Sequence, residues 1–365
     1  MERIMILGAG RTGRGFIGRL AAEAGMPVTF VDKDAELVEK LRKAKDDGGF
    51  TVRFYGDERE PLKITDYIAE IPTEKIDFSG ISLIMVSVGG AHLTEAGMWL
   101  KKVLPTNRLL YVIACENATE PAETLEKTIG LPNVMVSEAA VFCTCNSEGI
   151  DILSENYPDL PFDRKRLIGF TAPVPGFKEE LSFGNLLQRK IFTYNAASAV
   201  IAYMGWLYGF SDYAEAANDP RILKMLDQNY AATNRAICKE FGYDPEEQEA
   251  FALLSKKKFT NPAIVDTIAR NAREPQRKLG PEERILGPIG LLIRNEEDAS
   301  VLYKTAAAAL LYRDETDPEW TEIQETCSPE EILQKYGKLK DPAIMEHIMG
   351  YYEALIHETE DPEGD

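Results

Sequence analysis

The chain has 365 residues, 44% hydrophobic and 28% charged, which is enough for two domains with sizeable cores. Sixty acidic against 41 basic residues give a net charge of −19, which argues against nucleic acid or an anionic membrane as partner because both bind basic surfaces. No stretch approaches the roughly twenty apolar residues of a membrane span, and the start carries no cleavable signal pattern. We expect a cytoplasmic protein that acts on a small molecule.

The first 32 residues predict a nucleotide-binding unit. An apolar strand at 3–7 precedes the segment GAGRTG at 8–13, an apolar-periodic helix, and a second strand that ends at Asp32. Gly8 permits a tight turn, Gly10 lets the backbone approach a pyrophosphate, and Gly13 lets the helix pack on the strand. The free N–H groups at the start of the helix favour phosphate. The predicted cofactor-binding residues are Gly8, Ala9, Gly10, Arg11, Thr12, Gly13, Asp32, Val88, Gly89 and Asn117.

Asp32 decides which dinucleotide is favoured. Its carboxylate can accept two ribose hydroxyls and would repel the 2′-phosphate of NADP, so we predict NAD. The neighbouring Lys33 keeps NADP as an alternative. FAD is a second alternative, because flavoproteins share this fingerprint, and a strand-turn-helix without ligand is a third.

The pattern along the chain predicts an α/β fold. Continuous apolar strands separated by helices indicate a Rossmann-like, doubly wound, mainly parallel sheet over residues 1–185. The main strands are expected at 3–7, 28–32, 81–88, 109–115 and 133–136, with strand-like segments at 50–54 and 62–64 and a charged helix at 35–45. Segments 152–153 and 167–170 are expected to extend the sheet in antiparallel fashion. Gly89 and Asn117 then fall at the carboxyl ends of strands, where ligands bind in such folds.

From residue 186 to 365 the pattern predicts an all-helical substrate and catalytic domain. Helices are expected at 186–205, 220–241, 245–254, 261–272 and 300–311. The acidic tail from 353 to 365 is expected to fray. The five cysteines are scattered, which suits a reducing compartment, and neither Cys143-Thr144-Cys145 nor the three histidines complete a metal-binding pattern, so we expect no metal.

Three polar segments could carry chemistry. On an ideal helix Ser198 lies about 80° and Asn195 about 140° round from Lys190, so one broad face can present all three. Burial and nearby positive charge would lower the pKa of Lys190 and make it a usable base; the alternative is an exposed surface lysine. Asn117, after a buried strand, can donate to a reacting oxygen or lie in an ordinary turn.

The third segment is basic. Four arginines and a lysine lie between 270 and 284, and guanidinium groups bind phosphate or carboxylate in bidentate fashion. We predict substrate contacts from Arg273, Arg277 and Lys278. A face of ion pairs with neighbouring glutamates is equally compatible with the sequence.

These segments, in this order, resemble the polyol-specific long-chain dehydrogenases along most of the chain. The resemblance is carried by residues 8–18, 113–117, 189–195, 259–262 and 273–279. It implies that Lys190 is the general acid/base, that Asn117 and Asn195 bind the reacting oxygen, and that NAD is used without a metal. It also implies a monomer, and it implies interconversion of mannitol 1-phosphate and fructose 6-phosphate.

The sequence departs from the family at two places. Ser198 stands where the family has a histidine, and the family's Val-Asp-Arg segment is replaced near 141–143. Ser198 is shorter and uncharged, so the substrate must come closer or a water must bridge the gap; His92 could substitute. The alternatives are therefore a dehydrogenase of another polyol, sugar acid or hydroxy acid, and an NAD(H)-binding sensor without turnover.

Overall fold

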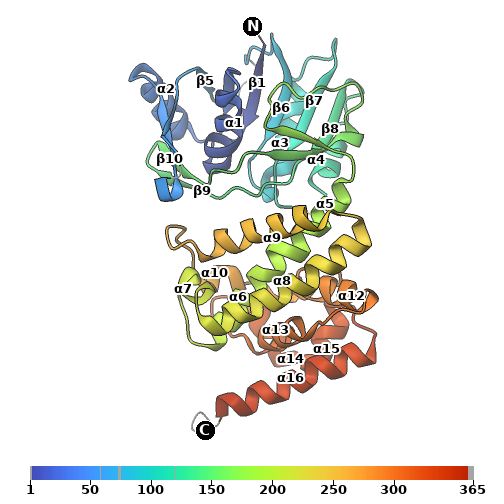
Figure 1. The fold of residues 1–365 in the computed structure, drawn as a ribbon. Helices are drawn as coiled ribbons and strands as arrows, with labels where there is room; N and C mark the ends of the chain where they lie inside the picture. Colours follow the sequence, from blue (N-terminus) through green and yellow to red (C-terminus); the bar gives the residue numbers. More distant parts are fainter. Residues whose placement is uncertain (1, 58, 73–74, 119, 361–365) are drawn as a thin grey trace. The chain divides into compact units, whose positions relative to one another are not determined.

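A computed structural model describes residues 2–57, 59–72, 75–118 and 120–360. The chain divides into two compact units, Met1–Phe183 and Gly184–Asp365. As the sequence predicts, the first is α/β with a parallel sheet and the second is helical (Figure 1).

A six-stranded sheet forms the centre of the first unit. Its order is β5-β2-β1-β6-β7-β8, and every neighbouring pair is parallel. The strands are β1 (Arg3–Leu7), β2 (Val28–Val31), β5 (Tyr67–Glu70), β6 (Ile81–Val86), β7 (Leu110–Ala114) and β8 (Val134–Glu138). The order reverses between β1 and β6, and in such sheets ligands bind outside the carboxyl ends of the strands at this point.

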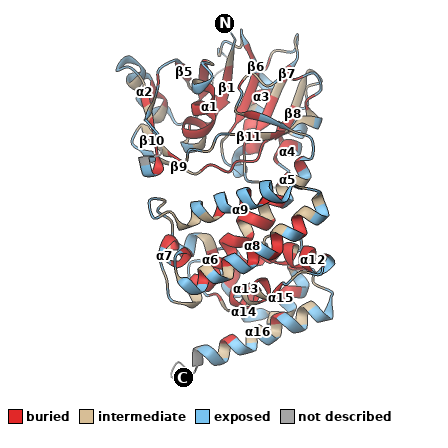
Figure 2. Cartoon of the chain, viewed as in Figure 1, coloured by how far each residue is buried: buried red, intermediate tan, exposed pale blue. Residues whose placement is uncertain are grey.

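Helices cover both faces of this sheet because its strands are apolar on both sides (Figure 2). Along β1, Ile4 and Ile6 pack into one core and Met5 and Leu7 into the other, since successive side chains point to opposite faces. The first core is closed by η1 (Gly13–Ile17), α1 (Gly18–Glu23) and α2 (Ala35–Asp46), and the second by α3 (Leu93–Val103) and α4 (Pro121–Ile129). The short turn η2 (Tyr55–Asp57) follows strand β3 (Phe50–Phe54), and the short turn η3 (Gly90–His92) precedes α3.

A second, four-stranded sheet corrects one prediction. The expected segments 50–54 and 62–64 form β3 (Phe50–Phe54) and β4 (Leu62–Ile64), and they join β9 (Cys145–Glu148) and β10 (Asp151–Ser154) in the order β4-β3-β10-β9. The segment 152–153 therefore does not extend the main sheet; it pairs in parallel with β3. The Asp151 carboxylate helps to fix this pairing by accepting the Thr51 N–H at 2.7 Å.

The expected strand at 167–170 is also wrong. A pair of parallel strands, β11 (Leu160–Asp163) and β12 (Phe177–Glu180), flanks this region, and the short helix η4 (Arg164–Arg166) ends there. The apolar side chain of Phe170 packs on the rings of Tyr111 and Phe162, and the residue does not belong to a strand.

The second unit is built around the buried helix α6 (Ala196–Leu207). The other helices are α5 (Phe183–Lys190), η5 (Ile191–Asn195), α7 (Tyr213–Ala217), α8 (Pro220–Phe241), α9 (Pro245–Thr260), α10 (Ile268–Ala272), α11 (Pro275–Lys278), α12 (Leu286–Arg294), α13 (Ser300–Leu311), α14 (Pro318–Thr326), α15 (Pro329–Lys335) and α16 (Pro342–Glu360). The helices expected at 220–241 and 300–311 have the predicted bounds.

Three expected helices differ. The one expected at 186–205 begins at Phe183, ends at Leu207 and is interrupted by the π-turn η5. Helix α9 runs six residues beyond the expected end at 254. Residues 261–267 are not helical: Asn261 is extended, as a residue before proline prefers to be, and the helix resumes at Ile268.

The acidic tail does not fray from 353 as expected. Residues 353–360 belong to α16, which packs on α13 through buried Ile348 and Leu355 and through the rings of His347 and Tyr303. Residues 361–365 lie outside the described part of the chain.

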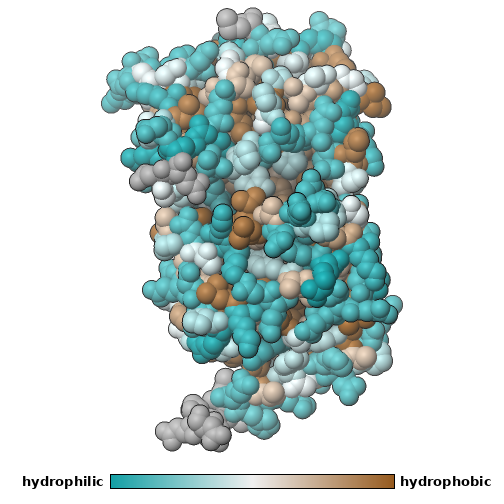
Figure 3. All heavy atoms as spheres, in the orientation of Figure 1, coloured by the Kyte–Doolittle hydropathy of each residue, from teal (hydrophilic) through white to brown (hydrophobic). Residues whose placement is uncertain are grey.

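The surface is mainly hydrophilic, as the charge composition requires. On the face drawn in Figure 3, apolar side chains gather in separate patches between teal regions. Within the described residues, no helix combines the length and apolar character needed to span a bilayer.

Candidate functional site

The glycine loop after β1 has the conformation that its sequence predicts. Gly8 has a φ of +99°, and a Cβ there would lie 2.0 Å from the Ser87 carbonyl oxygen, so only glycine fits. A Cβ on Gly13 would lie 2.0 Å from the Gly8 oxygen, whereas one on Gly10 would meet no heavy atom within 4 Å. Gly8 and Gly13 are thus required by close packing, whereas the space above Gly10 is open.

The loops after three neighbouring strands meet at one edge of the main sheet. Backbone hydrogen bonds run from Ser87 to Leu7 and from Cys115 to Val86, each at 2.7 Å. They bring the ends of β1, β6 and β7 together, and with them the glycine loop, Val88, Gly89 and the exposed Asn117. The predicted cofactor-binding residues of the first unit therefore cluster.

Two carboxylates hold these loops. Asp32 accepts the Ala9 N–H at 2.7 Å and the Asp34 N–H at 2.9 Å. Glu116 accepts the Gly89 N–H at 2.7 Å, and burial raises its pKa above the ordinary value. Glu116 was not among the predicted site residues, although its place between a buried strand and Asn117 signals it.

The basic residues of the loop differ in environment. Arg11 is exposed and 3.5 Å from the Asn146 oxygen, and Thr12 precedes the π-turn η1. Arg14, which sequence reasoning missed, is 2% exposed and donates to the Ala9 carbonyl at 2.9 Å. Its guanidinium therefore supports the loop from beneath, while the Arg11 side chain remains at the surface.

Lys33, which keeps NADP as an alternative cofactor, and His92, which could substitute for the family's histidine, lie together at the surface. The Lys33 ammonium is 3.1 Å from the Glu95 carboxylate and 3.5 Å from the His92 ring. All three side chains are at least half exposed, so these ion pairs contribute little to stability.

Lys190 lies in the second unit, at the end of α5. It is partly buried, and that burial, reinforced by the positive charges of Lys258 and Arg284, lowers its pKa to about 7. At neutral pH its amine is therefore shared between the protonated and deprotonated forms, which suits a group that exchanges protons.

Asn195 and Ser198 follow Lys190 across the π-turn. Asn195 is half-buried, and Ser198 is buried beside the hydroxyl of Tyr213 on α7. The turn closes through a hydrogen bond from the Ala196 N–H to the Ile191 carbonyl, five residues back. It therefore winds more residues per turn than an α-helix, and the angles expected from ideal spacing do not apply.

The predicted substrate-binding residues are separated by their environments. Arg273 is exposed, and Arg277 is exposed and paired with Glu274 at 2.9 Å and Glu283 at 3.2 Å. Lys278 is 3% exposed. Its ammonium donates to the carbonyls of Asn271 and Arg273, and burial, with Arg284 and Arg277 nearby, lowers its pKa to about 7.

Arg284 lies close enough to both Lys190 and Lys278 to affect their charges. Its side chain is 16% exposed, it pairs with Glu283 at 3.2 Å, and its charge lowers the pKa values of both Lys190 and Lys278. The end of the basic segment, rather than its middle, thus comes near Lys190. In the sequence, Arg284 is the last arginine of the basic segment, and nothing there distinguishes it from the other three.

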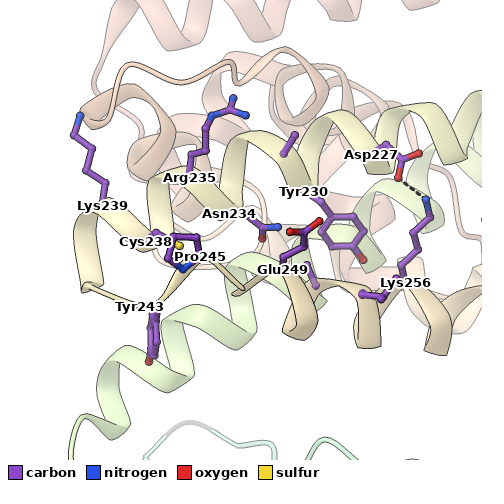
Figure 4. Close-up of a pocket in the computed structure, with 13 residues that line it drawn as sticks. Asp227, Tyr230, Asn234, Arg235, Cys238, Lys239, Tyr243, Pro245, Glu249 and Lys256 are labelled. Carbon is purple, nitrogen blue, oxygen red and sulfur yellow. Dashed lines mark hydrogen bonds and ion pairs between the residues drawn. The ribbon is translucent and has the colours of Figure 1, made fainter. Parts of the chain in front are cut away.

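A groove of about 820 Å³ lies between α8 and α9 (Figure 4). Asn234, Cys238 and Tyr243 line one part, and an ion pair between Asp227 and Lys256 lies at the other (Figure 4). None of the predicted site residues lines this groove.

Comparison with known proteins gives matches to both units. Residues 185–357 match the mannitol dehydrogenase C-terminal domain, and residues 4–151 match the ketopantoate reductase PanE/ApbA family. The mannitol-1-phosphate 5-dehydrogenase of Geobacillus thermodenitrificans is 30% identical over 351 residues, covering 89% of this chain and 90% of the relative. The enzyme of the same name from Exiguobacterium sibiricum is 28% identical and covers 95% and 96%.

Solved structures share the fold. Mannitol 2-dehydrogenase of Pseudomonas fluorescens, in a ternary complex with NAD and D-mannitol, gives a TM-score of 0.70 at 14% identity, over 99% of this chain and 92% of that one. A D-sorbitol dehydrogenase gives 0.72 at 13% identity, over 96% and 92%. The resemblance found in the sequence is thereby confirmed: the chain belongs to the mannitol dehydrogenases, the polyol-specific long-chain dehydrogenase family.

Proposed function

We propose that the protein is an NAD-dependent polyol dehydrogenase that interconverts mannitol 1-phosphate and fructose 6-phosphate. In this reaction one CH–OH carbon loses a hydride and its oxygen loses a proton, and both are returned in the reverse direction. The observation that carries the proposal is the similarity of most of the chain to enzymes named mannitol-1-phosphate 5-dehydrogenase. The partly buried Lys190, whose pKa is lowered to about 7 by burial and by the charges of Lys258 and Arg284, suits the proton transfer.

The first unit fits a dinucleotide. The open space above Gly10 leaves room for a pyrophosphate, and the Asp32 carboxylate, fixed by the Ala9 N–H, lies where a ribose is bound in this fold. Bound NAD would supply the hydride acceptor. Asp32 favours NAD over NADP because a 2′-phosphate would meet its negative charge, and Lys33 is paired with Glu95.

The second unit supplies the acid/base group. Deprotonated Lys190 takes the hydroxyl proton during oxidation, and protonated Lys190 returns it during reduction. Asn195 and Asn117 carry amide N–H donors that can stabilise the oxygen as its charge changes. Because Lys190 performs this step, we propose a mechanism without a metal.

Arg284 is our candidate for the phosphate of the substrate. It is a largely buried guanidinium in a strongly acidic protein, and it lies near Lys190, whose pKa it lowers. A bound phosphate would neutralise positive charge there and can accept two hydrogen bonds from one guanidinium. Arg273 remains a candidate at the surface, whereas Arg277 and Lys278 are occupied by glutamates and by backbone carbonyls.

A different substrate is the second candidate function, and Ser198 is the reason for it. The hydroxyl beside Tyr213 replaces an imidazole, so the contacts to substrate hydroxyls differ from those of the family. A non-phosphorylated polyol, a sugar acid or another hydroxy acid would then be preferred.

The test is NADH consumption by the purified protein with fructose 6-phosphate, fructose and a panel of keto acids, followed by the reverse reaction. We expect fructose 6-phosphate to give the highest kcat/KM. Preference for an unphosphorylated compound would support the second candidate, and tight NADH binding without turnover on any compound would indicate a sensor.

A further inference from the structure

Gln248, on α9, is fully buried and uses its whole amide group in hydrogen bonds. Its oxygen accepts from the Arg189 Nε at 2.6 Å, and its nitrogen donates to the Thr193 hydroxyl at 3.1 Å and to the Asn234 oxygen at 2.8 Å. A buried amide that is satisfied at both ends holds its partners in one arrangement, because any displacement leaves a polar atom unpaired.

Two of these partners flank Lys190. Arg189 precedes it directly, and Thr193 lies inside the π-turn that follows. Arg189 is further fixed by the Glu247 carbonyl at 3.1 Å and by the rings of Tyr243 and Phe251, 4.1 and 4.3 Å from its guanidinium carbon. The Arg189 guanidinium is therefore held by contacts within the second unit.

The π-turn matters for what Lys190 and Asn195 can do together. Five residues of α-helix would leave Asn195 about 140° round from Lys190, near the limit of what one broad face can present. A turn closed five residues back rotates less per residue, so Asn195 comes closer to the Lys190 side of the helix. An isolated segment would favour the regular α-helix, since π-turns are rare, so something must hold this one.

We propose that Gln248 is a positioning residue, which links Arg189 to Thr193 across the π-turn and so keeps Lys190 and Asn195 on one side of the helix. This inference rests on the proposed function for its catalytic readout. It assigns Gln248 no contact with substrate or cofactor.

Thr193→Val is the sharpest test, because it keeps the shape of the side chain and removes only the hydroxyl that Gln248 bonds. We expect kcat to fall roughly 10-fold, with NADH affinity unchanged, as for an acid/base group displaced by a fraction of an ångström. The pH at which the rate changes should also move above 7, because a loosened Lys190 is better hydrated. Thr193→Ser retains the hydroxyl, so its kcat and the pH at which its rate changes should match those of the wild type. Gln248→Met should reproduce the effects of Thr193→Val.

Tyr230→Phe is the matched control for a purely structural loss. It removes the buried hydrogen bond of 2.9 Å between Tyr230 and Ser255, which joins the same helices α8 and α9 without touching the π-turn. We expect it to lower the melting temperature but to leave the pH profile unchanged. Equal effects of Tyr230→Phe and Thr193→Val on the profile would overturn the proposal.

A second readout separates this proposal from the proposed function. The pKa of Lys190 can be followed by NMR after reductive methylation with 13C-formaldehyde, with no turnover required. A raised pKa in Thr193→Val and not in Thr193→Ser supports the positioning role even if no substrate is turned over. An active wild-type enzyme whose kcat and Lys190 pKa are both unchanged in Thr193→Val would refute it.

Discussion

Substitution by alanine should have different effects at two glycines of the same loop: it should lower thermal stability at Gly13 and NADH affinity at Gly10. At Gly13 the new Cβ would lie 2.0 Å from the Gly8 oxygen, so the start of η1 must move by about 1.2 Å to reach an acceptable contact near 3.2 Å. Overpacking of this kind costs about 1–3 kcal/mol. For a unit of this size that corresponds to a drop of roughly 2–12 °C in melting temperature.

At Gly10 the same methyl group meets no heavy atom within 4 Å, so Gly10→Ala should melt as the wild type does. It would, however, occupy the space into which we expect the pyrophosphate to come. We therefore expect the Kd of NADH to rise at least 10-fold, about 1.4 kcal/mol.

The assay is thermal unfolding of each variant, combined with titration of NADH by fluorescence or calorimetry. Gly184→Ala is the control, because Gly184, like Gly10, has open space at the Cβ position and no left-handed backbone, and it lies outside the loop. Wild-type NADH affinity in Gly10→Ala would refute the assignment of this loop to the cofactor, whatever Gly13→Ala does.

Further predictions concern three residues and the removal of metal ions. Lys190→Met should lower turnover roughly 10²–10⁴-fold with NADH binding intact. In the wild type, the rate of oxidation should fall as the pH falls through about 7, and the rate of reduction should fall as the pH rises through that value. A flat pH–rate profile would contradict the acid/base role of Lys190. Arg284→Leu should raise the KM of fructose 6-phosphate at least 10-fold, about 1.4 kcal/mol, and affect fructose little, and equal losses for both would argue against a phosphate contact. Arg277→Leu removes only exposed ion pairs and should change KM less than about twofold; a larger change would return it to the substrate site. Dialysis against EDTA should leave the initial rate unchanged, and an activity restored by added Zn²⁺ would rule out the metal-independent mechanism.

Local patterns predict most of the first unit. Strand β1 and the glycine loop are specified by neighbouring residues, since alternation of apolar side chains and the steric demands of Gly8 act over a few positions. The segment 152–153 is different: its strand character was predicted, but its partner β3 lies about a hundred residues away, and no local pattern selects among exposed strand edges. Phe170 belongs to a segment that the sequence predicts to be a strand, because an aromatic residue buried against other rings gives the same apolar pattern as a strand residue.

The candidate site is less predictable in the second unit. Charge alone groups Arg277 with Arg284, but only the folded chain places the first among exposed glutamates and the second in a largely buried position. The π-turn has no sequence signal in a segment that reads as a continuous helix. Its position after Lys190 depends on a hydrogen bond from Gln248, 55 residues away from Thr193.

The small sheet has a consequence for how the protein is made. A Cβ at Gly15 would lie 2.3 Å from Ile152 and 3.0 Å from the Cys145 sulfur, so the helical segment η1, which follows the glycine loop, packs closely on β9 and β10. During synthesis the six strands of the main sheet are complete once β8 has emerged, yet this helix still lacks the surface that covers it. Pairing with distant segments is slow because a long loop must close first. Nucleotide binding should therefore mature after the parallel sheet, and a fragment that ends at β8 would contain the whole GxGxxG fingerprint without the support that gives it shape.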